Sequence, residues 1–232
     1  MYTSLDLLKQ IRRENGWSVP DFEQLLSGSC RPYFHVQYRD WDHIKTTIFN
    51  IEDKERRTFI DVGANIGLIS VPAKQYFKNV YAIEPHPLTA QCLQANMSRE
   101  KNGMSSGNFE VIQAVAGSHK GSSKLYCPPN ANTSGYMTTI EKENWSEQTV
   151  PMISIDGLGL THCDFIKLDV QGSELQVVQG AEQTIKTYKP FMYVETKEGT
   201  DALDLLLSWG YVKLHSFKKG HEVLNHKRRR LQ

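Results

Sequence analysis

The stretch Phe59-Ile60-Asp61-Val62-Gly63-Ala64-Asn65-Ile66-Gly67 decides the fold of this 232-residue chain. Its apolar first half predicts a buried strand, and the glycines that follow predict a loop leading into a helix. Gly63 leaves room for a ligand beside the backbone, and Gly67 opens the N-terminus of the helix. The spacing Asp-x-Gly-x-x-x-Gly differs from the Gly-x-Gly-x-x-Gly pattern of a dinucleotide site.

The rest of the chain repeats this alternation of short apolar runs and helical stretches. Strands are expected at 58–62, 80–83, 109–115, 164–169 and 191–195, helices at 67–77, 87–99, 173–188 and 201–209, and a closing hairpin at 211–216 and 222–224. Apolar strands joined by helices predict a parallel sheet covered on both faces. We therefore expect an α/β fold with a doubly wound, mostly parallel, seven-stranded Rossmann-like sheet, helices on both faces and a short N-terminal extension.

Two segments depart from this rhythm. Residues 1–57 are irregular, with an amphipathic helix expected at 5–11 and an aromatic segment at 32–38; we interpret them as an N-terminal extension and a possible acceptor-side cap. Residues 58–232 then form one domain, with an insertion at about 117–157 that is rich in Ser, Asn, Thr, Gly and Pro. Short strands are expected within it at 124–127 and 151–155.

The composition argues against several partners and locations. The chain has 27 basic and 26 acidic residues, a formal charge of +1, so a nucleic acid is not the expected partner. No uncharged apolar run reaches the ~20 residues of a membrane span, and no signal peptide is recognisable. Four scattered cysteines show neither zinc nor disulfide spacing, which predicts a cytoplasmic protein.

Acidic residues at the ends of the first two strands fit a ligand with positive charge and a ribose. Asp61 suits the ammonium and sulfonium of adenosylmethionine better than it suits a pyrophosphate. Glu84 follows the next strand about twenty residues later, where an acid accepts hydrogen bonds from both ribose hydroxyls. After the third strand, the small apolar Ala114 and Val115 would let an adenine ring stack. His86 lies between two prolines, which favours a loop or helix-cap role.

Three further carboxylates are candidates for the chemistry. Asp169 ends a buried strand at the same edge of the sheet, and a strand-end carboxylate is costly unless something pairs with it. Glu195 ends another strand in the same way, so the two could hold or deprotonate a substrate hydroxyl. Glu174 stands at a helix start, where a third catalytic role and a simple pairing with the helix dipole remain equally open.

Five segments together resemble the FkbM family of methyltransferases: FIDVGANIG, VYAIEPHP, VIQAVAGSHKG, DFIKLDVQGSELQVVQGA and YKPFMYVET. The resemblance covers roughly residues 58–212. It implies the class I methyltransferase fold, S-adenosyl-L-methionine as donor with S-adenosyl-L-homocysteine as product, and an O-linked acceptor such as a sugar, glycoconjugate or macrolide.

By the family motif, Asp169 would face the reacting centre and also border the donor. The donor site would comprise Asp61, Gly63, Ala64, Asn65, Gly67, Glu84, Pro85, Ala114 and Val115. One departure is Gln171, which stands where the family commonly has a glutamate in Asp-Val-Glu-Gly. If that glutamate acts as a base, its role here falls to Asp169 or Glu195.

Three alternatives to a small-molecule or glycan O-methyltransferase stay open. An RNA ribose 2′-O-methyltransferase would use lysines near a strand-end aspartate, and Lys197 lies close to Glu195 in sequence. A nicotinamide oxidoreductase would share the sheet and the ribose acid, and Gln171 makes a non-catalytic binding module conceivable. Tyr33, Tyr136 and Trp145 could stack on an acceptor sugar. We predict no metal, and the acceptor and the oligomeric state stay undetermined.

Overall fold

The structure is a computed structural model that describes residues 11–14, 16–20, 31–99, 107–129, 137–195, 201–217 and 220–227. For residues 12, 14 and 31–39 it describes the backbone alone. The N-terminal part contains the hairpin β1 (Ile11–Glu14) and β2 (Trp17–Pro20), the long helix α2 (Arg31–Ile48) and the short helix η1 (Asp53–Glu55). The amphipathic helix expected at 5–11 lies almost wholly outside the described residues, and its last residue, Ile11, belongs to β1.

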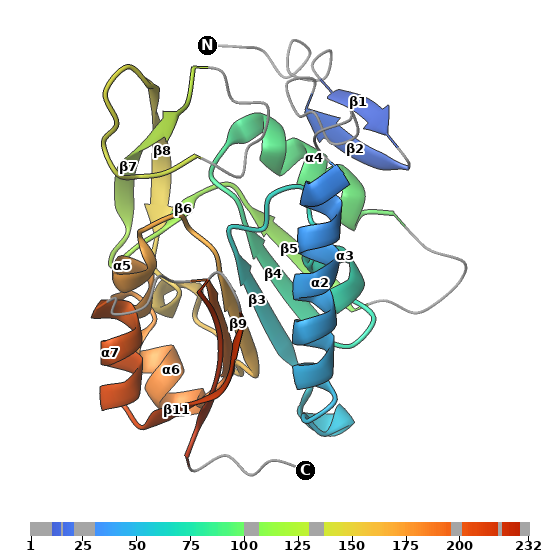
Figure 1. The fold of residues 1–232 in the computed structure, drawn as a ribbon, viewed down its shortest axis with the longest axis vertical. Helices are drawn as coiled ribbons and strands as arrows, with labels where there is room; N and C mark the ends of the chain where they lie inside the picture. Colours follow the sequence, from blue (N-terminus) through green and yellow to red (C-terminus); the bar gives the residue numbers. More distant parts are fainter. Residues whose placement is uncertain are drawn as a thin grey trace.

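The central sheet has seven strands in the order β11-β12-β10-β9-β3-β4-β5 (Figure 1). They are β3 (Thr58–Val62), β4 (Asn79–Ile83), β5 (Asn108–Ile112), β9 (Phe165–Leu168), β10 (Phe191–Glu195), β11 (Tyr211–Phe217) and β12 (His221–His226). From β5 to β10 the neighbours pair in parallel, whereas β12 runs antiparallel to β10 and β11 antiparallel to β12. The predicted doubly wound, mostly parallel α/β fold is confirmed.

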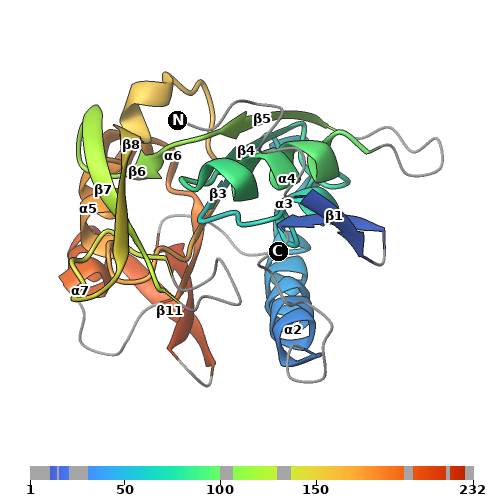
Figure 2. The same cartoon turned by 90° about the horizontal axis from the view of Figure 1, so that it is seen from above.

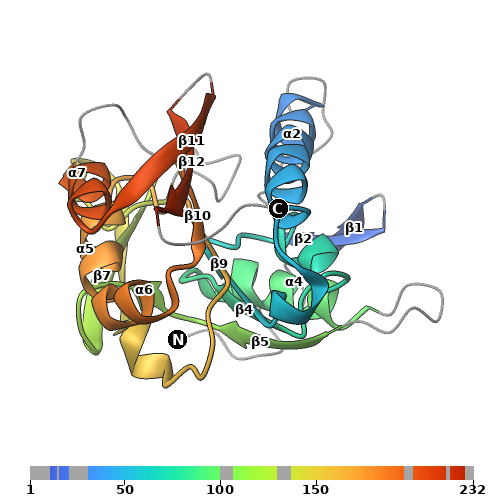
Figure 3. The same cartoon turned by 90° about the horizontal axis from the view of Figure 1, so that it is seen from below.

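Helices cover both faces of this sheet, as Figure 3 shows. On one face lie α2, α3 (Ser70–Ala73) and α4 (Pro87–Met97), and on the other α5 (Glu174–Gln179), α6 (Glu182–Tyr188) and α7 (Asp201–Ser208). Alternate residues of the central strands fill two separate cores, because successive side chains of a strand point to opposite faces. Phe59, Phe165 and Phe191 face α2, while Ile60, Ile166 and Met192 face α5 to α7.

A second, three-stranded sheet stands near the carboxyl ends of the central strands (Figures 1 and 2). It contains β6 (Val115–Ala116), β7 (Gly121–Cys127) and β8 (Ser146–Ile153), in the order β6-β8-β7, and is followed by the short helix η3 (Asp156–Leu158). The strand expected at 109–115 was therefore wrong at its end: β5 stops at Ile112, and Val115 pairs instead with Met152 of β8.

Three helical regions differ from the sequence prediction. The 18-residue α2 was not predicted at all, because its buried residues Ile44, Thr47 and Ile48 are interspersed with charged and aromatic ones. The helix expected at 67–77 shrinks to α3 and continues as a tight turn, where Gln75 N–H donates to Pro72 O. The helix expected at 173–188 divides at Gly180, where an added Cβ would stand 1.9 Å from Gly117 O. The chain can pass the insertion there only without a side chain.

Within the described part of the chain, no helix is long and apolar enough to cross a membrane.

Candidate active site

The predicted site lies where the strand order of the sheet reverses. After β3 the chain adds β4 and β5 on one side and then returns to add β9 on the other. Ligands of open α/β sheets bind at the carboxyl ends of strands beside such a reversal. Gly63 follows β3 there, with a φ of +75°, and a Cβ on it would stand 1.8 Å from Asp169 O at the end of β9. Only glycine allows the two strand ends to approach this closely.

Backbone hydrogen bonds and left-handed backbone conformations fix the loop that follows β3 at this edge of the sheet. Gly63 N–H and Ala64 N–H both donate to Ile83 O at the end of β4, each at 3.0 Å. Asn65 and Gly67 have φ values of +51° and +95°. The left-handed region favours glycine and tolerates asparagine, which explains these residue types in the loop. Asn65 N–H in turn donates to Glu84 Oε2 at 3.0 Å.

Glu84 joins the first two loops of the site. Its Oε2 accepts from Asn65 N–H and its Oε1 accepts from His86 N–H at 3.0 Å. Burial raises its pKa to about 7, although the two backbone donors and Lys167 act in the opposite direction. A carboxylate oxygen can accept two hydrogen bonds, so each has capacity left for a hydroxyl. Pro85 is half-buried between Glu84 and His86.

His86 caps the start of α4. Its ring Nδ1 accepts from Thr89 N–H at 3.4 Å at the start of α4, and Pro87 takes the first helical position. Burial lowers its pKa to about 4, so the ring is neutral and Nδ1 can accept. The helix-cap prediction is confirmed.

Two small, apolar residues lie just beyond the end of the third strand, β5. Ala114 and Val115 are both buried, and Ala114 N–H donates to Ile112 O where the chain leaves the central sheet. Glu84 N–H donates to the same carbonyl of Ile112 at 3.1 Å. Ala114 therefore borders the segment that carries Glu84, whereas Val115 packs with Leu125 and Val150 of the second sheet.

Below the strand ends, the register aligns three polar side chains on the face covered by α2. Asp61 pairs with Lys167 across β3 and β9, and Lys167 pairs with Tyr193 across β9 and β10. The carboxylate of Asp61 is fully buried: Oδ2 accepts from Ser70 Oγ at 2.5 Å, and Oδ1 lies 3.1 Å from Lys167 Nζ. Asp61 therefore lies beneath the loop, enclosed by partners from its own fold.

Lys167 is a buried cation of the site. Its Nζ donates to Gly63 O at 2.9 Å and lies 3.6 Å from Asp169 Oδ2. Burial lowers the pKa of this amine, but Asp61 and Asp169 outweigh burial, and the net pKa lies above the ordinary value. Lys167 thus stays charged and ties the glycine loop to both carboxylates.

Asp169 and Glu195 form a carboxyl pair in the next row towards the edge. Burial raises the pKa of Glu195 to about 8, and the charge of Asp169 and a hydrogen bond with it add to the rise. Lys167 opposes the rise. Because two neighbouring carboxylates do not readily ionise together, the pair holds one proton near neutral pH. Such a pair can hold a hydroxyl and accept its proton.

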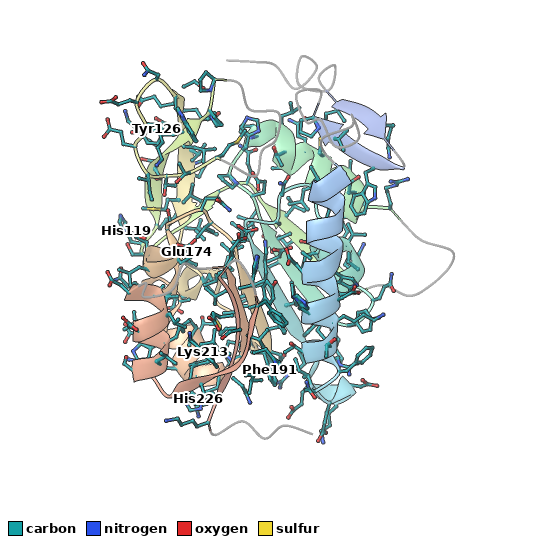
Figure 4. The ribbon with its side chains drawn as sticks, viewed as in Figure 1. His119, Tyr126, Glu174, Phe191, Lys213 and His226 are labelled. Atoms are coloured by element: carbon teal, nitrogen blue, oxygen red, sulfur yellow. The ribbon has the colours of Figure 1, made fainter. Side chains whose placement is uncertain are left out.

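Glu174 makes its hydrogen bond to the loop that follows β9. It is buried, and its Oε1 accepts from Gly172 N–H at 2.9 Å. Figure 4 shows it at the end of the sheet opposite Phe191, which begins β10. The geometry assigns Glu174 to holding the loop after β9, and its catalytic role stays a prediction.

The sequence model described as "Methyltransferase FkbM domain" matches residues 61–213. The chain belongs to the FkbM methyltransferase family. No significant match is found among curated proteins.

Several solved structures align with this FkbM-family chain. The Escherichia coli protein yhhF, which carries a provisional methyltransferase assignment, aligns with 13% identity and a TM-score of 0.51 over 92% of this chain and 94% of that one. Methyltransferase FkbM from Methylobacillus flagellatus KT aligns with 24% identity and a TM-score of 0.48 over 73% of this chain. The match spans 43% of that longer protein. Magnesium protoporphyrin IX methyltransferase from Synechocystis PCC 6803, solved with bound SAM, has 10% identity, a TM-score of 0.47 and coverages of 86% and 83%.

The glutamine that departs from the common motif of the FkbM family has a specific contact. Gln171 Nε2 donates to Asp169 Oδ1 at 2.9 Å, and its backbone has a φ of +55°. An ionised glutamate could not donate this hydrogen bond. Gln171 therefore supports the carboxylate of Asp169 in this FkbM-family chain.

Four site residues of this FkbM-family chain were missed from the sequence: Lys167, Tyr193, His221 and Asp40. Lys167 and Tyr193 stand two residues before Asp169 and Glu195, so the same strand alternation could have found them. Nothing local pointed to Asp40 or His221, since they come from α2 and β12.

Three candidate site residues from the sequence analysis fall outside what the structure describes: Lys197, Tyr136 and the side chain of Tyr33. Among the described side chains, no group of three or more His, Cys, Asp or Glu gathers as metal ligands would.

Proposed function

We propose that this chain is an S-adenosylmethionine-dependent O-methyltransferase that acts on a hydroxyl of a sugar, a glycoconjugate or another small metabolite. One observation carries the proposal: a ribose-type acid and a carboxyl pair meet at the reversal of the strand order. Glu84 stands at the end of β4, and Asp169 and Glu195 stand at the ends of β9 and β10.

The residues on the donor side fit adenosylmethionine. The carboxylate of Glu84 is fixed by the amides of Asn65 and His86 and keeps lone pairs for the two ribose hydroxyls. The backbone of the Gly63 loop gives access to the amino-acid portion, and Ala114 with Val115 supplies an apolar side for adenine. Bound there, the donor supplies an activated methyl group. Because Asp61 is enclosed by Ser70 and Lys167, we assign it to holding the loop from behind.

On the acceptor side, the chain has to align a hydroxyl and remove its proton. Alignment of the reacting atoms can supply about 7–11 kcal/mol, and a positioned base about 10²–10⁴-fold in rate. Asp169, supported by Gln171 Nε2 and Lys167 Nζ, is the carboxylate that we expect to receive the proton, and Glu195 assists.

We further propose that the insertion and the N-terminal segment border the acceptor. Thr138 Oγ1 donates to Gln171 O at 2.9 Å, so the insertion contacts the loop that carries Gln171. Asp40 of α2 contacts Tyr193 behind the carboxyl pair.

The donor site is tested by calorimetric titration with S-adenosylhomocysteine and, separately, NADH. We expect micromolar binding of S-adenosylhomocysteine that is lost in Glu84→Ala. Glu110→Ala is the matched control, because Glu110 is an exposed carboxylate on the neighbouring strand β5. Binding of NADH without S-adenosylhomocysteine would overturn the proposal.

The reaction is tested by transfer of a labelled methyl group to a panel of sugars, glycoconjugates, macrolides and RNA, with the methylated atom located by NMR. Asp169→Asn should nearly abolish transfer while S-adenosylhomocysteine still binds. Full activity in this variant, or methylation of RNA alone, would contradict the assignment.

A further inference from the structure

Behind the carboxyl pair lies a buried line of hydrogen-bonding groups from three separate elements. Tyr193 Oη donates to Asp40 Oδ1 at 3.1 Å and also lies 3.1 Å from His221 Nδ1. Asp40, Tyr193 and His221 are 9%, 1% and 3% exposed. Glu195 and His221 are direct partners across β10 and β12, and His221 Nε2 lies 3.9 Å from Glu195 Oε1.

The hydrogen-bond donors in this line fix the tautomer of the histidine. A phenol has one hydroxyl hydrogen, and Tyr193 uses it to donate a hydrogen bond to the carboxylate of Asp40. The phenol oxygen must then accept from His221 Nδ1–H, so a neutral ring presents the lone pair of Nε2 towards Glu195. The line therefore orients a proton acceptor towards the carboxyl pair.

We propose that His221, held in this tautomer by Tyr193 and Asp40, is the final proton acceptor of the site and acts through Glu195. This inference rests on the proposed methyl transfer. Tyr193 and Asp40 are positioning residues, and through Asp40 the helix α2 completes the site.

The proton balance of the step gives His221 a definite role after the carboxyl pair has taken up the proton. In the reaction, the O–H bond of the acceptor and the S–CH₃ bond of the donor break, and an O–CH₃ bond forms. The released proton goes to Asp169, the proton already shared with Glu195 moves to His221 Nε2, and the ring becomes an imidazolium. The positive charge lost from sulfur is thus retained on the ring until solvent removes the proton.

The distance between His221 Nε2 and Glu195 Oε1 is longer than a hydrogen bond. At 3.9 Å, Nε2 and Oε1 need a shift of about 1 Å or one bridging water for proton transfer. The side chain of Glu195 is 37% exposed, which leaves it room for either.

The charged and titratable groups on this face come from six elements. Among the described residues they are Asp40 and His43 on α2, Asp61 on β3, Lys167 and Asp169 beside β9, Tyr193 and Glu195 on β10, His215 on β11, and His221 on β12. His43 stacks on Phe217 with 3.6 Å between ring centroids, and Phe217 is the strand partner of His221.

The tautomer is tested by ¹⁵N NMR of the eight histidines in the full chain, without donor or acceptor. Loss of a signal in His221→Gln identifies the ring. We expect Nδ1–H and an unprotonated Nε2 near neutral pH, with this preference lost in Tyr193→Phe, which keeps the shape of the buried ring. An Nε2–H tautomer in the native chain would overturn the proposal.

Proton sharing is tested with two variants that remove one carboxylate each. Asp169→Asn leaves a carboxylate next to His221, whereas Glu195→Gln leaves one farther away. The pKa of His221 should be higher in the first by about one unit or more, because an opposite charge within ~4–6 Å favours the protonated ring. Glu147→Gln, an exposed carboxylate on β8, should leave it unchanged. Equal pKa values in the two site variants would overturn the proposal.

Activity separates this role from a purely structural one. With an acceptor from the panel, His221→Gln and Tyr193→Phe should lower kcat by about 10²-fold, leave KM and S-adenosylhomocysteine affinity unchanged and alter the pH profile. An unaltered kcat would overturn the inference and leave the donor site intact. Failure of S-adenosylhomocysteine to bind the native chain would instead overturn the proposed function, whatever the tautomer of His221.

Discussion

At the scale of the residue, charge in the site is balanced around one buried lysine. Lys167 Nζ reaches Asp61 at 3.1 Å, Asp169 at 3.6 Å and the carbonyl of Gly63 at 2.9 Å. Removing one partner of a buried pair leaves the other charged and desolvated, which costs far more than the pair itself contributes. Lys167 therefore decides how much negative charge the sheet edge can hold.

Lys167→Met is expected to lower the free energy of unfolding by about 3–5 kcal/mol, because it strands the carboxylate of Asp61 in the core. Urea unfolding measures the change. The double variant Lys167→Met, Asp61→Asn should recover much of the loss, since it removes the uncompensated charge. A double variant less stable than Lys167→Met would contradict this account.

The raised pKa of Glu195 predicts how stability depends on pH. Its pKa is about 8 in the folded chain against 4.5 as the ordinary value, so folding favours the protonated form. This contribution is fully present below about pH 4.5 and is lost as pH rises through 8. The melting temperature, measured at several pH values across this window, should fall less steeply with pH for Glu195→Gln than for the native chain. Parallel declines would show that Glu195 is not the group responsible.

At the scale of the element, the glycine loop is fixed from three sides. Ile83 O of β4 accepts two of its amides, Asp169 O of β9 lies against Gly63, and Asn96 of α4 donates through Nδ2 to Ile66 O at 2.8 Å. Asn96 also donates to Ser18 O and accepts from Ser18 N–H, which joins the hairpin of β1 and β2 to the same loop. The proposed donor side is thus preorganised by elements on both sides of it.

Gly63→Ala should abolish S-adenosylhomocysteine binding, because the new Cβ would stand 1.8 Å from Asp169 O and force β3 and β9 apart. Gly159→Ala is the matched control: its φ of +62° is also positive, but nothing lies within 4 Å of the added Cβ. We expect the control to cost about 1–2 kcal/mol in stability and to keep its affinity. Calorimetry on both variants decides, and equal losses of affinity would point to backbone strain alone.

At the scale of the whole molecule, α2 belongs to the same core as the sheet. Ile44 and Ile48 are fully buried and pack in one cluster with Phe59, Phe165 and Phe191. Figure 1 shows this helix lying along the sheet, although its sequence precedes the first central strand. The helix α2, which lies in the segment interpreted as an N-terminal extension, therefore packs on one face of the sheet, and its Asp40 contacts Tyr193 behind the carboxyl pair.

Ile48→Ala should cost about 2–5 kcal/mol of stability, as for other large aliphatic residues truncated in a core. Unfolding should remain a single transition by circular dichroism and fluorescence. Thr46→Ala, an exposed position on the same helix, should change stability by about 0.5 kcal/mol or less. A separate early transition in Ile48→Ala would mean that α2 unfolds independently of the sheet.

Much of the central fold followed from local pattern. The apolar runs in Thr58–Val62 and Phe191–Glu195 predicted the strands, and a carboxylate at a strand end predicted where Asp169 and Glu195 would lie. The division of the helix at Gly180 did not follow, because it depends on the carbonyl of Gly117 in a distant loop.

The sequence by itself determined the seven strands of the central sheet, the glycine loop and the identity of the strand-end acids, because apolar runs and backbone freedom are local properties. Only the tertiary structure decided which charges compensate one another: that Lys167 encloses Asp61, that Gln171 supports Asp169, and that Asp40 and His221 stand behind Glu195. These contacts join residues on separate strands and helices, and they exist only once the sheet has fixed its register.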